Sequence, residues 1–98
     1  MKLPLFKKGQ DPTIVLGTQV MNCEDYIDYL IQEELDQTLL RTGFAKARHN
    51  NPTFFNALKK QIEHDIDHHI KNRQNWNSFD ELYYSNMMTI YKFFEVIQ

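Results

Sequence analysis

Turn-forming residues are scarce in this sequence of 98 residues, which contains only 3 glycines and 3 prolines. A chain of average composition would contain about 12 of them. Because folds made of many short strands need frequent turns, this scarcity favours long helices. The glycines are also isolated, at Gly9, Gly17 and Gly43, which excludes a glycine-rich loop of the kind that binds phosphate.

Long apolar runs and a second cysteine are also absent. The single thiol, Cys23, cannot form an internal disulfide or a thiolate cage for a metal ion. No stretch approaches the roughly 18 apolar residues that cross a bilayer. The segment that follows Lys2, Lys7 and Lys8 is too short and too polar for a signal peptide. The sequence therefore predicts a cytoplasmic protein with no membrane partner.

Charge is present in separate blocks. The formal net charge is −2, but residues 23–40 carry six acidic side chains and no basic one, and residues 41–60 carry five basic side chains and no acidic one. One interpretation is that the two blocks face each other across antiparallel helices, where each surface ion pair contributes about 0–1 kcal/mol. The alternative is that the basic region 41–60 binds nucleic acid, although the acidic blocks would repel the phosphates.

Local start signals predict three main helices. Asn22 is an N-cap candidate that two acidic residues follow, and Gly43 provides a stop signal for this first helix. Asn51 followed by Pro52 begins a second helix that extends to about Arg73. A capping box over residues 78–81 opens a third helix, which continues to the end of the chain.

The predicted fold class is all-α. We expect a small three-helix bundle over residues 22–98, forming one domain, with a short additional helix at residues 44–49 as the alternative. Residues 1–21 form an extended N-terminal arm. Within it, Thr13–Leu16 is apolar and β-branched, as strands are, but the sequence offers no obvious partner strand. The arm is therefore expected to lie on the helices, with a strand exchanged between subunits as the alternative.

The helical wheel places more apolar side chains on the helices than a small bundle can bury. The second helix has one apolar stripe, from Phe55 to His69, but the first and third helices each have a second apolar side. Either the N-terminal arm covers these additional apolar side chains, or they form an interface, where tyrosine, methionine and arginine are enriched. We expect an aromatic interface with charged edges that consists of Tyr26, Tyr29, Glu33, Arg41, Lys46, Arg48, Tyr84, Met88 and Tyr91.

The histidines indicate a different kind of site. His64 and His68 lie one helical turn apart and could reach one metal ion, although further ligands would be needed. Solvated histidines are the alternative. His69 is expected to be a core histidine whose ring is bonded by the Asp65 carboxylate. Because no nucleophile accompanies these side chains, we expect no enzymatic activity and no cofactor.

These patterns predict a non-enzymatic module that binds another protein or a second copy of itself, as a homo-oligomer. Inhibitors, immunity proteins, assembly chaperones and phage-encoded blockers of host enzymes are small proteins of this kind. The alternatives are a nucleic-acid-binding regulator that uses residues 41–60 and a helical metal-binding protein that uses His64 and His68.

Overall fold

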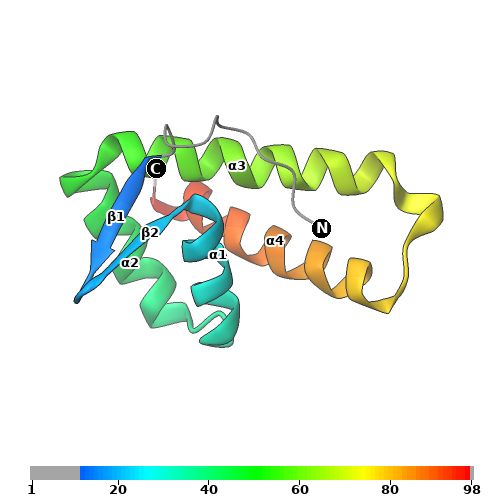
Figure 1. Cartoon of the computed structure of the whole chain (residues 1–98), viewed down its shortest axis with the longest axis horizontal. Helices are drawn as coiled ribbons and strands as arrows, with labels where there is room; N and C mark the ends of the chain where they lie inside the picture. Colours follow the sequence, from blue (N-terminus) through cyan, green and yellow to red (C-terminus); the bar gives the residue numbers. More distant parts are fainter. Residues whose placement is uncertain (1–11, 98) are drawn as a thin grey trace.

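The computed structural model describes residues 12–97, with side chains to Glu95 (Figure 1). A two-stranded hairpin precedes four α-helices and a short 3₁₀ turn. Helices make up 77% of the structure, so the prediction of a mostly helical protein is confirmed, but the count of three main helices is wrong. The prediction and the structure differ at residues 13–22, which form the hairpin, and at residues 33–36, which separate two helices.

The hairpin pairs β1 (Thr13–Leu16) with β2 (Gln19–Asn22) in antiparallel register. The connection is a two-residue turn in which Gly17 has φ 62°, the left-handed conformation that glycine adopts without strain. The prediction that Thr13–Leu16 has no partner strand in this chain is therefore wrong. Residues 19–22 were missed because the segment is short and its two apolar residues, Val20 and Met21, are adjacent, so the alternating pattern of a strand is not visible. The rest of the predicted arm, residues 1–11, lies outside the described residues.

The first predicted helix is two helices, α1 (Cys23–Gln32) and α2 (Gln37–Asn50). Its start is confirmed, since Asn22 forms a capping box with Asp25. The chain then reverses through Glu34 and Leu35, which both have positive φ, and Asp36 caps α2 by accepting a hydrogen bond from the Leu39 amide. Gly43, expected as a stop signal, lies inside α2.

The two long helices, α3 (Pro52–Lys71) and α4 (Ser78–Ile97), lie antiparallel and are joined by a 3₁₀ turn, η1 (Arg73–Asn75). The start of α3 at proline is confirmed. The capping box of α4 is one residue earlier than predicted, because Asn77 and Asp80 exchange two side-chain to backbone bonds of 3.0 Å. Within residues 12–97, no helix has the length and apolar character needed to cross a membrane.

An aromatic core holds one end of the molecule together. The ring of Phe44 on α2 packs 4.5 Å from Phe94 on α4, and both rings lie near Phe55 on α3. Fully buried apolar side chains end at Ile62 on α3 and begin at Met87 on α4. Beyond these positions the paired helices extend past α2 and the hairpin (Figure 1). The far half of the α3–α4 pair therefore has apolar side chains but fewer elements to cover them.

Candidate functional site

A groove between α3 and α4 is the main candidate site. Three of the predicted interface residues, Tyr84, Met88 and Tyr91, line one wall of it from α4. The groove has a volume of about 270 Å³. The α3–α4 groove is lined by Glu63, Ile66, Asp67, Ile70, Tyr84, Met88 and Tyr91.

The apolar side chains of the groove are only partly used by the core. Ile66 and Tyr91 pack against the buried cluster, whereas Ile70, Tyr84 and Met88 are not among the side chains that do so in residues 12–95. Ile70 is 49% exposed, and Tyr84 and Met88 are half-buried. Folding the monomer thus leaves the apolar side chains Ile70, Tyr84 and Met88 in partial contact with water along the groove, where they are accessible to a partner.

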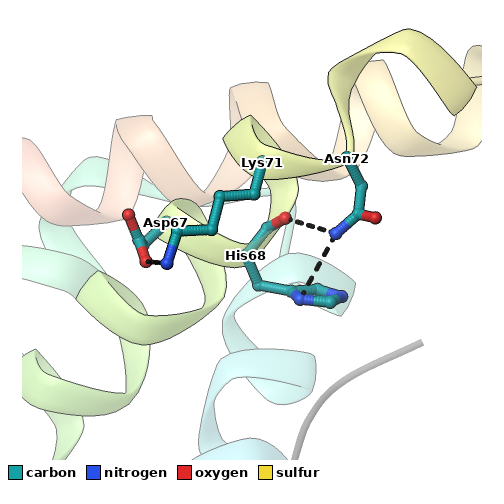
Figure 2. A network of polar contacts seen from close by, with 4 residues as sticks. All are labelled: Asp67, His68, Lys71 and Asn72. Carbon is teal, nitrogen blue, oxygen red and sulfur yellow. Dashed lines mark hydrogen bonds and ion pairs between the residues drawn. The ribbon is translucent and has the colours of Figure 1, made fainter.

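Acidic groups line the edge of the groove on α3. The hydroxyl of Tyr91 donates a 2.9 Å hydrogen bond to the Glu63 carboxylate, and this bond is the main reason that the pKa of Tyr91 is raised. Asp67, also in the groove lining, pairs with Lys71 at 3.0 Å (Figure 2). The groove therefore combines an apolar floor with polar groups at one side, as protein interfaces do.

The aromatic strip continues to the turn between the helices. The Trp76 ring lies 5.1 Å from the Tyr84 ring, and the Arg73 guanidinium is 5.6 Å from the Trp76 ring centre. The indole N–H donates to the His69 carbonyl at 2.8 Å, which fixes the orientation of Trp76. Trp76 therefore continues the aromatic contacts of Tyr84 towards the turn, in a pocket with His68, His69 and Asn72 that is separate from the groove.

Tyr26 was predicted to be part of the interface, and this prediction is wrong. Its side chain is 2% exposed and packs edge-on to Phe54 at 5.6 Å. The ring fits because Gly43 has no side chain: a Cβ there would lie 2.6 Å from the Tyr26 hydroxyl. Tyr29 is half-buried, stacked on Tyr26 at 6.1 Å. Both tyrosines thus belong to the core side of α1.

The burial of Tyr26 predicts a loss of stability at alkaline pH. Burial, and to a smaller extent Tyr29, raises the pKa of Tyr26 to about 12. The unfolded chain ionises this group near pH 10, so the stabilisation is complete below pH 10 and is lost as pH rises towards 12. We expect the free energy of unfolding, measured with urea, to fall by about 2 kcal/mol between pH 10 and pH 12 because of Tyr26 alone.

A matched variant isolates this effect. Tyr26→Phe keeps the ring but removes the ionisable group, so its free energy of unfolding should fall less steeply between pH 10 and 12. An identical slope in the variant and the parent protein would contradict the assignment.

The charged residues predicted for the interface do not reach the groove. Glu33, Arg41, Lys46 and Arg48 are exposed, but none of them lines it. On α2, Arg41 and Arg48 lie on one side, while Lys46 is rotated from them by about 140–160° at 100° per residue. Lys46 instead lines a separate pocket beside β1. The predicted set of nine residues therefore does not form one surface.

No metal site is formed by the two predicted histidines. Among the residues that the structure describes, no group of three or more histidine, cysteine, aspartate or glutamate side chains could hold a metal ion. The Asn72 side-chain amide donates to the His68 carbonyl at 2.9 Å and lies 3.4 Å from its ring Nδ1 (Figure 2). His64 is half-buried, and its Nε2 has no hydrogen-bond partner within the part of the chain that the structure describes.

His69 is buried as predicted, but its partner differs. Its Nδ1 lies 2.9 Å from the Asp65 backbone carbonyl, so this nitrogen carries the proton. The Asp65 carboxylate instead accepts bonds from the Gln61 amide at 3.0 Å and the Tyr83 hydroxyl at 3.3 Å. Burial, with Asp65 next in importance, raises the pKa of Tyr83 well above its usual range. This polar cluster joins α3 to α4.

The α3 wall of the groove was not recognised in the sequence. Ile66 and Ile70 continue the same four-residue repeat as the buried Leu58 and Ile62, so a sequence pattern alone assigns them to the core. The signal that could have found them is helix length. Because α3 has 20 residues, against 10 for α1 and 14 for α2, its C-terminal part extends beyond the helices that pack on it.

The chain is thus a small, mostly helical protein with an open apolar groove on its longest helix pair. Comparisons with protein-family models, curated proteins and solved structures found no match to it. Its function must therefore be argued from the groove itself.

Proposed function

We propose that this protein is a non-enzymatic module that binds another protein through the α3–α4 groove. The observation that carries the proposal is the set Ile70, Tyr84 and Met88, which lies outside the core cluster yet forms one continuous strip. Tyrosine and methionine are enriched at interface centres, where partly buried side chains become fully buried on binding.

The open shape of the groove favours a protein partner over a small molecule. The groove is a hollow at the surface and not an enclosed pocket, whereas small-molecule sites bury most of the surface of their ligand. The groove suits the insertion of a few apolar side chains from a partner surface. Glu63 and Asp67 beside the strip favour a partner with basic residues next to those apolar side chains.

Such binding suits the classes expected from the sequence, namely inhibitors, immunity proteins, assembly chaperones and blockers of an enzyme of another organism. A second copy of the chain is a partner of the same class, and it would give a homo-oligomer. Sedimentation of the purified protein separates self-association from binding to a different protein.

The experiment is site-specific photocrosslinking in the native cell, followed by affinity measurement with the purified partner. A photoreactive residue at Met88 should capture a partner, and the same residue at Phe79 should not. Phe79 is the matched control because it lies on the same helix and is 81% exposed, but it does not line the groove. Once the partner is identified, the double variant Tyr84→Ala, Met88→Ala should bind it at least about 30-fold more weakly. This factor corresponds to a loss of roughly 1 kcal/mol or more at each of the two residues.

Two outcomes would overturn the proposal. One is that Phe79→Ala weakens binding as much as the groove variant does. The other is that the groove variant loses its helical circular dichroism, which would show that Tyr84 and Met88 are needed for folding.

A further inference from the structure

A second site lies at the other end of α3, beside the hairpin. A pocket of about 310 Å³ runs along β1 and is lined by Thr13, Ile14, Val15, Leu16, Lys46, Ala47, Asn50 and Asn51. All four residues of β1 contribute to this lining and none of β2 does, so the pocket lies along the edge of β1 that faces away from its partner strand. The edge strand and the last turn of α2 thus form the two sides of a channel.

The register of the hairpin shows which backbone groups face this channel. In a two-residue hairpin the residues that flank the turn, Leu16 and Gln19, form a hydrogen-bonded pair, and pairs then alternate along the ladder. Ile14 bonds to Met21 in the same way, whereas Val15 and Thr13 point their N–H and C=O groups outward. Within residues 12–97, no other segment bonds to these outward groups. An open strand edge of this kind pairs with an added strand.

The polar side chains of the channel determine the chemistry of that strand. Lys46 is exposed at the channel and makes no ion pair with any residue in the described range. Asn51 is the N-cap of α3 but its side chain makes no capping hydrogen bond. A carboxylate on the added strand would pair with Lys46, the one charged side chain among the described residues that line the channel.

We propose that the β1 edge and Lys46 form a binding site for an extended acidic peptide segment of a partner protein. The segment adds as a strand next to β1, and one of its carboxylates contacts Lys46. Val15, which is 63% exposed, becomes covered by the peptide. The site is distinct from the α3–α4 groove, because Asn51 and Ile66 are 15 residues apart on one helix, about 22 Å. Both sites can therefore be occupied at once, and this proposal does not depend on the function proposed for the groove.

The probes are two acetylated and amidated heptapeptides, Thr-Glu-Val-Glu-Val-Glu-Thr and its twin with lysine in place of glutamate. Titration into the ¹⁵N-labelled full chain should shift the amide signals of Thr13, Val15 and Lys46 with the glutamate peptide. The lysine peptide should bind at least about tenfold more weakly. Lys46→Glu should reverse this preference, weakening the glutamate peptide and strengthening the lysine peptide by about tenfold each.

A pair of proline variants tests the strand edge. Val15 and Val20 face each other in a pair that makes no ladder hydrogen bonds, so proline at either position removes only an outward N–H group. Val15→Pro should abolish binding of the glutamate peptide, and Val20→Pro, on the opposite edge, should leave it unchanged. Equal effects of the two proline variants, equal binding of the two peptides, or signal changes confined to the α3–α4 groove would overturn the proposal. If Val15→Pro unfolds the hairpin, the charge reversal at Lys46 decides the outcome.

Discussion

Asp65→Ala is expected to lower the free energy of unfolding by about 3 kcal/mol, because it removes a buried acceptor from two donors. The Asp65 carboxylate is 1% exposed and accepts bonds from Gln61, which is itself 2% exposed, and from Tyr83. Alanine would leave the Gln61 amide buried without this partner and would open a small cavity between α3 and α4. Chemical denaturation monitored by circular dichroism measures the change.

Asp67→Ala is the matched control for Asp65. It removes the same carboxylate two residues further along the same helix, where the side chain is 65% exposed and pairs with Lys71 (Figure 2). Its loss should change the free energy of unfolding by less than about 0.5 kcal/mol. Similar effects of the two alanine variants would show that the buried cluster does not join the helices as described.

Gly43→Ala is expected to destabilise the protein by about 1–2 kcal/mol, although alanine is the better helix former by about 1 kcal/mol. The added Cβ would lie 2.6 Å from the Tyr26 hydroxyl. The Tyr26 ring cannot move away easily, because Tyr29, Phe44 and Phe54 pack around it. Overpacking of this kind typically costs 1–3 kcal/mol.

The same substitution in a Tyr26→Phe background tests the cause. Without the hydroxyl, the nearest ring atom to the new Cβ is the ring carbon at 4.0 Å, an ordinary contact. Gly43→Ala should then be neutral or stabilising, and a double-mutant cycle should give a coupling of about 2 kcal/mol. Additive effects of the two substitutions would rule out the steric explanation.

The sequence predicted those parts of the fold that local chemistry determines. Asn22 with Asp25 marks a helix start because the cap satisfies amide groups within one turn. Pro52 marks another because a proline at the first helical position has no N–H group to satisfy. The reversal at Glu34 and Leu35 has no such signal, since neither is the glycine or asparagine that a left-handed turn favours. The continuous apolar repeat through this region therefore indicated one helix where there are two.

The α4 side of the candidate site could be predicted from the sequence and the α3 side could not, for a related reason. Tyr84, Met88 and Tyr91 were assigned to the outside because a second apolar side on one helix is visible in the sequence. Whether Ile66, Ile70 or Tyr26 is covered depends on which helices lie over them, and that follows from helix lengths and from the space above Gly43. These properties belong to the assembled structure, and a helical wheel of a single helix gives no information about them.

The unequal lengths of the helices also make the molecule unequally stable along its long axis. The turn from Arg73 to Asn75 and the adjoining helix ends lie beyond the aromatic core, so separating them exposes little apolar surface. Such a segment opens at a lower free energy than the whole domain unfolds. The turn end of the α3–α4 pair is therefore expected to open before the end built around Phe44 and Phe94, while Ile66 and Tyr91, which pack against the core, hold the inner part of the groove in place.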